Sequence, residues 1–505
     1  MKSTFTKDFL SSFVVFLVAL PLCLGIAIAS GVPPELGLIT GILGGLVVGF
    51  LSGSPLQVSG PAAGLVVLVF ELIQEHGLAA LGLILMLAGL MQIAAGLLKT
   101  GQWFRAISPA VVYGMLAGIG ILIMAGQFHV VVDDSPKGTG ITNIMSIPNA
   151  IFNGIFPIDG SVHETAALIG LLTIAVQLGW NRFRPESLKF LPGPLMGILA
   201  AASASFAFSL EIRHVNVPDN LLGGLKLPDF SLLKSLVEWK YWGEALALAF
   251  IASAETLLSA AAVDKMTAAS GRRDLRTDYN RELMAQGVGN FCCGFLGSVP
   301  MTGVIVRSSA NVQAGAQTRW SSIMHGAWLL ATVMIVPHWL ERIPTSALAA
   351  VLVLTGWKLV NPEHVKKLMG YGRMPVVIYF ATVLGIVFED LLTGVLIGIA
   401  LTVGKMLYKA SRLSVKLVPH HSGRTDLYLE GCATFLRLPA LADALDKIEP
   451  NSEVYIHYGQ LYYIDHSCLE LVQDWSKTHA DNGGKVHVEW GRLEERFKQE
   501  AAMSV

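Results

Sequence analysis

Long apolar runs recur along the first four-fifths of the chain, and short polar loops separate them. A run of ~20 apolar residues is long enough to cross the hydrocarbon core of a bilayer as a helix. The pattern predicts fourteen membrane spans, two of them too short to cross alone, and therefore a polytopic α-helical membrane protein. The predicted spans lie near residues 9–30, 34–52, 58–74, 78–99, 104–127, 164–180, 190–210, 240–262, 282–297, 303–314, 321–338, 344–360, 373–387 and 389–412.

The pattern changes at about residue 413, where short strands and amphipathic helices replace the apolar runs. Strands that alternate with helices are typical of a small α/β domain. We therefore expect a transmembrane domain over residues 1–412 and a soluble domain over residues 413–505. The soluble part has no Walker-type loop, which favours a regulatory or oligomeric role over ATP hydrolysis. Its expected elements are strands at 425–431, 453–458 and 485–490, and helices at 438–448 and from Ser467.

The composition supports a membrane location. Hydrophobic residues make up 53% of the chain and charged residues only 14%, whereas a soluble protein carries about 25% charged residues. Much of the surface must therefore face lipid. The formal net charge of −1 gives no reason to expect nucleic acid as a partner. The five cysteines show no framework spacing, which argues against disulfides and against a zinc site.

Lys and Arg in the short loops predict the orientation, because cytoplasmic loops of membrane proteins are rich in these residues. If the N-terminal lysines are cytoplasmic, the loops that contain residues 182–189, 265–281 and 358–373 are cytoplasmic as well, and all three are rich in cations. The short loop at 74–76, which is assigned to the outer side, contains neither Lys nor Arg. This distribution places both termini and the C-terminal domain in the cytoplasm.

The third and tenth predicted spans share an unusual design, in which Gly and Pro break a short extended stretch that continues as a short helix. The first break lies at residues 57–64 (QVSGPAAG) and the second at 297–304 (GSVPMTGV). Both breaks are third in a set of seven spans, and matching breaks in two halves of a transporter mark its binding site. A half-helix that starts inside the membrane presents free N–H groups and the positive end of its dipole. Two such starts facing each other predict an anion site.

Among the charged residues of the predicted spans, two are the candidates for function. Glu255 lies in the eighth span and Arg307 in the tenth, one turn after the break, and a charge at this depth is a functional-site hypothesis by default. Arg307 would reinforce anion attraction at the half-helix start. Ser259 shares the face of Glu255 and Thr302 lies at the second break, so these oxygens could hold Na⁺ or a proton. The alternative is that Glu255 and Arg307 form an ion pair that joins helices, and both roles are compatible.

Several motifs together resemble the SulP anion transporters, and the tail resembles their STAS domain. The motifs are Ala19-Leu20-Pro21, Ser59-Gly60-Pro61-Ala62-Ala63, Asn280-Arg281-Glu282-Leu283, Gly297…Pro300…Arg307-Ser308 and Tyr463-Ile464-Asp465-His466-Ser467. The resemblance implies fourteen spans as a seven-plus-seven inverted repeat with core and gate domains, and a cytoplasmic STAS domain. It also implies an elevator-like movement of the core against the gate, a homodimer, and the cytoplasmic (inner) membrane of a bacterium.

The resemblance further implies which residues line the site. By position, the anion would lie near residues of the first, third and tenth spans, and a coupling cation such as Na⁺ would lie near Glu255 and Ser259 in the eighth. The implied anion-binding residues are Leu22, Ala62, Ala63, Val306 and Arg307.

Three of these positions depart from the sulfate-type members, many of which carry polar side chains there. Leu22, Ala62 and Val306 offer no side-chain donors, so the site would use backbone N–H groups and suit a small monoanion better than a dianion. The segment 255–259 (ETLLS) is similar to the Asp-Ser-Leu-Leu-Thr pattern of bicarbonate-transporting members, where that pattern serves a Na⁺ site. We therefore expect bicarbonate as the substrate, cotransported with Na⁺ or H⁺.

Two other functions fit the same motifs. One is a sulfate or dicarboxylate symporter of the same fold, and the other is an uncoupled anion channel. Glu255 argues against a channel, because an uncoupled anion path gains nothing from a carboxylate. The sequence shows no catalytic constellation that would indicate a membrane enzyme, and we expect no cofactor besides Na⁺ as a cotransported ion. The expected partners are a small inorganic anion, membrane lipid and a second copy of the chain.

Overall fold

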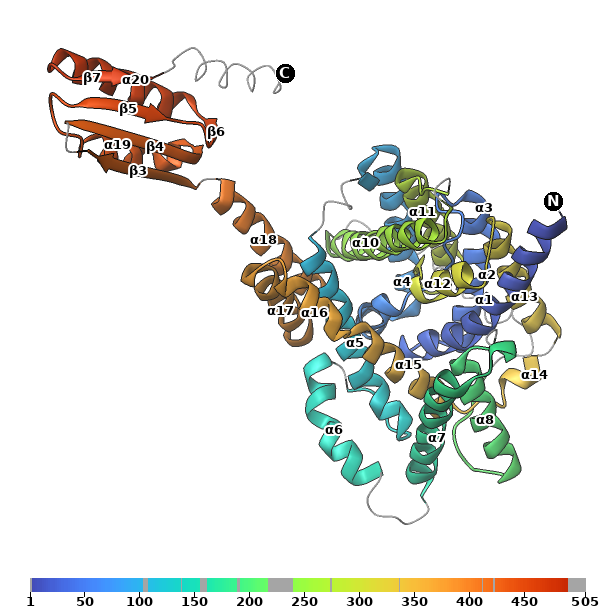
Figure 1. Cartoon of the computed structure of the whole chain (residues 1–505). Coiled ribbons are helices and arrows are strands. Elements are labelled where there is room, and N and C mark those ends of the chain that lie inside the picture. Colours follow the sequence, from blue (N-terminus) through green and yellow to red (C-terminus); the bar gives the residue numbers. More distant parts are fainter. Residues whose placement is uncertain are drawn as a thin grey trace. The chain divides into compact units, whose positions relative to one another are not determined.

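The computed structural model divides the chain into two compact units, Met1–Ile399 and Ala400–Val505. The first unit is a body of packed helices, and the second is a small sheet with helices (Figure 1). The boundary between the units lies within the helix Leu391–Ala410, before the predicted boundary at residue 412. The structure describes residues 2–102, 108–137, 139–154, 161–188, 191–216, 239–272, 275–335, 337–410, 412–420 and 423–488.

The first unit consists of helices and two very short strands. Its N-terminal elements are α1 (Lys2–Ala29), α2 (Pro34–Leu43), the π-helix η1 (Gly44–Val48), α3 (Gly49–Leu51), β1 (Ser59–Pro61), the 3₁₀-helix η2 (Ala63–Leu65), α4 (Val66–Leu97), α5 (Pro109–Val131), α6 (Gly140–Gly154), α7 (Val162–Phe183), η4 (Glu186–Leu188) and α8 (Gly193–Ala207). Its remaining elements are α10 (Trp239–Ala269), α11 (Tyr279–Phe295), β2 (Met301–Gly303), α12 (Ile305–Gln313), α13 (Trp320–Ile335), α14 (Pro337–Leu340), α15 (Thr345–Leu359), α16 (Pro362–Met369), α17 (Arg373–Phe388) and the first part of α18 (Leu391–Ala410), up to Ile399.

Many of these helices have the length and composition of membrane spans. Within the described ranges, seven helices are long and apolar enough to cross a bilayer. Three shorter apolar helices accompany them, at Gly193–Ala207, Trp320–Ile335 and Arg373–Phe388. The chain is therefore a membrane protein. The seven long helical segments are Thr4–Ala29, Pro34–Leu51, Ala63–Leu97, Pro109–Val131, Val162–Phe183, Trp239–Ala269 and Leu391–Lys409.

Helix α4 covers two predicted spans, 58–74 and 78–99. Gly77 interrupts it with φ +79° and ψ 166°, a backbone conformation that glycine adopts without the steric cost of a side chain. The regular helix therefore ends after His76 and a second one follows Gly77. This break coincides with the loop that the sequence predicts between the third and fourth spans.

The sequence pattern does not predict helix α6. Its apolar residues lie on one face instead of forming a continuous run, which is typical of a helix that rests against a neighbour. A histidine of α5 fixes this contact, because His129 Nε2 lies 3.1 Å from the Asn143 carbonyl oxygen and 3.0 Å from Ser146 Oγ. Sequence reasoning places a loop there because it searches for runs of membrane-crossing length.

The second unit is a small α/β domain whose strands are β3 (Leu413–Pro419), β4 (Arg424–Ala433), β5 (Glu453–His457), β6 (Leu461–Ile464) and β7 (Lys485–His487). In the described part of the chain they form a five-stranded sheet in the order β3-β4-β5-β7, with β6 paired to β4. The β3–β4 pairing is antiparallel, and the others are parallel. Helices α19 (Leu438–Leu445) and α20 (His466–Asp481) share the buried core with the sheet.

The predicted strands at 425–431 and 453–458 and the predicted helix at 438–448 are confirmed. The predicted helix near Ser467 begins at His466, where the Asp465 carboxylate caps it by accepting from the Cys468 N–H at 2.8 Å. Strands β3 and β6 are additional to the prediction. Of the predicted strand 485–490, residues 485–487 form β7, and residues 489 and 490 lie outside the described residues.

Candidate functional site

The two predicted breaks meet in space. Strands β1 and β2 pair antiparallel, with Ser59 opposite Gly303 and Gly60 opposite Thr302. The Val304 N–H extends the pairing by donating to the Val58 carbonyl at 2.9 Å. Because each strand leads directly into a helix, the starts of η2–α4 and of α12 lie at opposite ends of one three-residue ladder. The prediction of two half-helices whose starts come together is confirmed. We call the paired strands β1 and β2, together with the two helix starts, the crossing.

Neither half-helix has a side-chain cap. The N-cap residues are Ala62 for η2 and Val304 for α12, and neither can accept a hydrogen bond through its side chain. Soluble helices usually begin at Ser, Thr, Asp or Asn, whose side chains satisfy the first N–H groups. At η2 the Gly64 N–H lies beside the Glu255 carboxylate, whereas the first N–H groups of α12 remain at the positive end of its helix dipole. The arrangement suits an anion that supplies the missing acceptors.

A polar face of α11 holds the strand pair in place. The Asn290 amide accepts from the Met301 N–H at 2.8 Å and donates to the Met301 carbonyl at 3.1 Å. It also donates to Gln92 of α4 at 2.8 Å, and Gln286 donates to Ser59 Oγ at 2.5 Å. This geometry gives the amides of Gln286 and Asn290 a structural role. They replace the neighbouring strands that a two-stranded ladder lacks.

Helix α10 contacts the same strands through a residue that sequence reasoning did not single out. Thr256 Oγ1 accepts from the Gly303 N–H at 3.1 Å, and its carbonyl accepts from Gln57 Nε2 at 3.0 Å. Thr256 thus ties both breaks to the helix that carries Glu255. A threonine in an apolar helix is common, so only its contact with the crossing reveals this role.

Arg307 is a fully buried side chain, with 0% of its surface exposed. All three of its guanidinium nitrogens are buried, and none has a hydrogen bond of good geometry to a described residue, although the Cys23 thiol of α1 lies beside the guanidinium. The guanidinium lies against the backbone of β1, so that a methyl group at Gly60 would overlap Nη1. Burying an unpaired charge costs several kcal/mol. A ligand of opposite charge would remove most of that cost.

The alternative in which Glu255 pairs with Arg307 is wrong for this structure. The ion pairs between described residues do not include these two side chains, and the Arg307 nitrogens donate no hydrogen bond of good geometry to a described residue. Instead, the Glu255 carboxylate lies at the start of the other half-helix, where a methyl group at Gly64 would be 2.7 Å from Oε2. The cationic and anionic side chains therefore contact β1 and η2 at separate points.

Glu255 faces oxygen and N–H groups of both breaks. The Thr302 hydroxyl and the Gly64 N–H lie beside its carboxylate. Even so, Glu255 Oε2 and Thr302 Oγ1 are buried without a well-formed hydrogen bond to any described residue. Ser259, one turn further along α10, is 5% exposed. These three side chains place oxygen atoms where a hard cation or a proton could be held.

The remaining predicted residues surround this crossing unevenly. Leu22 and Ala62 are buried, and Ala63 is partly exposed at the start of η2. Val306 is 40% exposed although its neighbour Arg307 is buried. Consecutive helical residues point about 100° apart, so Val306 and Arg307 face different sides of α12. The structure brings Ala62, Ala63, Glu255 and Thr302 close to the crossing, and it separates the Val306 side chain from that of Arg307.

Sequence comparison places the chain in a known family. The model of the sulfate permease family matches residues 5–382. YvdB of Bacillus subtilis is 27% identical over 496 residues, which cover 96% of this chain and 86% of that protein. The bicarbonate transporter BicA of Synechocystis is 27% identical over 411 residues, 77% of this chain and 68% of that protein.

A solved structure shows the same fold. The murine solute carrier 26 family member A9 anion transporter, in its inward-facing state, superposes with a TM-score of 0.78 at 15% identity. The superposition covers 98% of this chain and 88% of that one. The family and the matched proteins are transporters and not enzymes. The chain is therefore a membrane transport protein, and it belongs to the sulfate permease family.

Proposed function

We propose that the protein is a secondary active transporter of a small inorganic anion, with bicarbonate as the substrate and Na⁺ or H⁺ as the coupled ion. The observation that carries the proposal is Arg307, a buried cation without a hydrogen bond of good geometry to a described residue, beside two uncapped half-helix starts. An anion bound there would neutralise the guanidinium charge and accept from the free N–H groups. The family and the relatives' names support anion transport.

The preference for a monoanion rests on the apolar side chains of the crossing. Leu22 and Ala62 are buried, and their side chains offer no hydrogen-bond donors. A dianion such as sulfate loses more hydration energy than a monoanion when it leaves water, and it needs more donors in return. With one guanidinium and backbone N–H groups as the donors, a singly charged oxyanion is the better match.

The coupled cation would bind near Glu255. Na⁺ is a hard cation that prefers oxygen ligands, and Glu255, Thr302 and Ser259 place oxygens on α10 and β2. A proton on the Glu255 carboxyl would serve as the alternative coupled ion. Since Thr256 ties α10 to both breaks, a cation bound at Glu255 would stabilise the same crossing that receives the anion.

The proposed architecture follows the family. It consists of fourteen spans in a seven-plus-seven inverted repeat, with a core domain that moves against a gate domain like an elevator. Residues 1–412 would form the transport domain, and residues 413–505 would form a cytoplasmic STAS domain in a homodimer. Both termini would lie in the cytoplasm of a bacterium, with the spans in its inner membrane.

A sulfate or dicarboxylate symporter is the second candidate, because the matching family model carries the description of a sulfate permease. An uncoupled anion channel is a weaker candidate, since the half-buried Glu255 beside the crossing adds a negative charge that an anion path alone does not need.

Radiolabelled uptake into proteoliposomes tests the proposal. Bicarbonate and sulfate are compared, each with and without inward Na⁺ and H⁺ gradients. We expect saturable bicarbonate uptake that one of the two gradients accelerates. Gradient-driven sulfate uptake with bicarbonate inert would establish the second candidate. Anion flux that follows only the membrane potential and ignores both cation gradients would establish the channel.

A further inference from the structure

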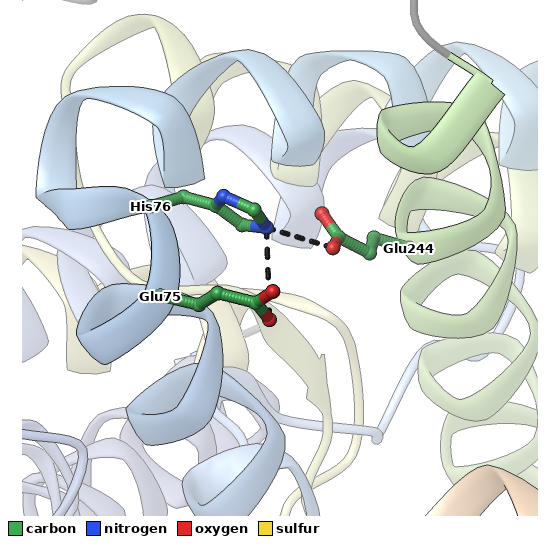
Figure 2. A group of neighbouring side chains, drawn as sticks. All are labelled: Glu75, His76 and Glu244. Carbon is green, nitrogen blue, oxygen red and sulfur yellow. Dashed lines mark hydrogen bonds and ion pairs between the residues drawn. The ribbon is translucent and has the colours of Figure 1, made fainter.

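A second group of polar side chains lies on the helices that form the crossing, but at a distance from it. Glu75 and His76 end the first part of α4, and Glu244 lies near the start of α10 (Figure 2). His76 Nε2 lies 2.8 Å from Glu244 Oε1 and 3.9 Å from Glu75 Oε2. One ligand atom from each residue lies within 4.8 Å of the others. Figure 2 shows the three side chains pointing toward one another.

The group is sheltered on one side and open on the other. The side chains of His76 and Glu244 are 9% and 18% exposed, and that of Glu75 is 58% exposed. Glu244 Oε2 is buried and has no hydrogen-bond partner within the described ranges. A buried carboxylate oxygen without a partner is unfavourable, and a cation bound beside the imidazole would satisfy it. Glu75 provides the solvent-facing ligand through which an ion could enter.

Lys240 supplies part of the positive charge. Its ammonium group bonds to Glu75 Oε1, whereas Glu75 Oε2 is the oxygen that faces His76. One oxygen of Glu75 is therefore occupied and the other remains available. Among the described ion pairs, Lys240 contacts only Glu75, and its charge acts on the nearby Glu244 without direct contact. The two carboxylates thus carry more negative charge than one lysine balances.

The donor set indicates the kind of ion. Mg²⁺ and Ca²⁺ prefer oxygen ligands throughout, whereas an imidazole nitrogen with carboxylate oxygens suits Zn²⁺ and related transition metals. We propose that Glu75, His76 and Glu244 form a divalent transition-metal site that binds Zn²⁺ through one nitrogen and two carboxylate oxygens. Water takes the remaining position, as in open three-ligand zinc sites. The cysteine spacing that argues against zinc does not bear on this site, which contains no cysteine.

The position of the site between α4 and α10 means that a bound metal ion would hold these two helices together. Helix α10 lies against η2 at Gly64 and Glu255. It contacts α4 through the Gln92–Ser253 hydrogen bond and, near its own start, through His76 and Glu244. A helix rises 1.5 Å per residue, so Glu244 and Glu255 are roughly 16 Å apart along α10. A metal ion would replace the single His76–Glu244 hydrogen bond by three stronger bonds. It would thereby fasten the two helices at the end remote from the crossing.

Isothermal titration of the full-length, chelator-stripped protein with ZnCl₂ tests the site directly. We expect one Zn²⁺ per chain, with affinity reduced at least tenfold in both His76→Ala and Glu244→Gln. The control is His163→Ala, which removes an exposed histidine at the start of α7 outside the group. Absence of Zn²⁺ binding by the wild type, or wild-type affinity in both site variants, would overturn the proposal.

Two further variants separate metal binding from a structural role. Lys240→Met removes the competing cation and should raise the Zn²⁺ affinity several-fold. If the ion-pair network has only a structural role, neither the wild type nor this variant should bind Zn²⁺. His76→Cys restores a zinc ligand at the same position and should recover binding that His76→Ala loses. Visible absorption of bound Co²⁺ provides a second readout, and it should change between the wild type and His76→Cys because a sulfur ligand replaces nitrogen.

Discussion

Each unit of the protein buries a charged side chain, and the two units treat that charge in opposite ways. In the second unit, Asp426 of β4 is 7% exposed and receives hydrogen bonds from Arg424 at 2.9 and 3.0 Å and from His420 at 2.9 Å. In the membrane unit, Arg307 is fully buried, and its guanidinium donates no hydrogen bond of good geometry to a described residue. A buried charge with its partners present serves the fold. One without them is available for a ligand.

The pKa of Asp426 reflects its surroundings. Burial raises the pKa of this carboxyl, but the hydrogen bonds from Arg424 and His420 outweigh burial and hold it below its usual range. The carboxylate is therefore charged and satisfied at neutral pH. Asp426 is thus a structural charge and Arg307 a candidate functional one, and substitutions at the two sites should have different effects.

Arg307→Gln should have the largest effect on transport. Loss of a charged ligand partner costs on the order of 3 kcal/mol, which corresponds to an uptake rate about 100-fold lower. The thermal stability of the purified protein should stay equal or rise, because the buried charge has no partner to lose. Proteoliposome uptake and thermal unfolding measure the two effects. In the control Arg319→Gln, which removes a donor to the Phe50 carbonyl, uptake should persist. Normal uptake by Arg307→Gln would exclude Arg307 from the site.

Glu255→Gln should remove the dependence of uptake on the cation gradient. The amide neither binds Na⁺ as a charged ligand nor accepts a proton, so gradient-driven uptake should fall roughly tenfold or more, equivalent to ~1.4 kcal/mol. Anion exchange between the two sides should persist, because Arg307 and the half-helix starts are intact. Uptake that keeps its full response to Na⁺ and H⁺ would contradict the coupling role.

Gly64→Ala should weaken coupling to a smaller extent. The new methyl group would lie 2.7 Å from Glu255 Oε2 and 3.1 Å from its carboxyl carbon, so the carboxylate must shift. We expect the cation concentration for half-maximal uptake to rise about three- to tenfold, or ~1 kcal/mol. Gly179→Ala in α7 is the matched control, because its methyl group would meet no atom within 4 Å. Equal responses in the two variants would show that the Gly64–Glu255 contact does not matter for coupling.

Asp426→Asn should leave the transport rate per folded molecule unchanged and lower the free energy of unfolding of the second unit. Loss of a charged acceptor for Arg424 should cost about 1–3 kcal/mol. The pKa of Asp426 is lower in the folded state than in the unfolded state, where it is about 3.9. The carboxylate therefore stabilises the folded unit fully above the unfolded pKa. This stabilisation is lost as the pH falls through the folded pKa. Hydrogen exchange of β4 and β5, corrected for intrinsic rates, should differ between variant and wild type at pH 7, and the difference should shrink below pH 4. A constant difference would exclude the carboxylate charge as its cause.

The sequence predicts the membrane helices and the charged residues of the site for the same reason. A charge inside an apolar run is costly, so its presence indicates a function. Glu255 and Arg307 are predicted on this ground. Their surroundings cannot be deduced in this way. That Glu255 lies against Gly64 and Arg307 against Gly60 depends on how segments distant in the chain pack. The contacts of Thr256 with both breaks depend on packing as well.

The differences from prediction have physical causes too. Helix α6 is amphipathic and rests on α5, so a search for long apolar runs passes over it. The polar group of Glu75, His76 and Glu244 is not predicted, because the sequence pattern assigns these residues to a solvated loop and to the start of a span. Only the antiparallel contact of α4 with α10 brings them together.

The ladder between β1 and β2 has a consequence for biogenesis. The two strands are synthesised far apart in time. The neighbouring hydrogen bond from the Val58 N–H to Ser308 Oγ, for example, joins residues that are 250 positions apart in the chain. Until the second half of the chain is inserted, the first half-helix carries an extended stretch whose backbone groups have no neighbour in the bilayer. The nascent first half should therefore remain water-accessible around residues 57–64 until β2 arrives. Closure of that segment would be the step that commits the chain to its native arrangement.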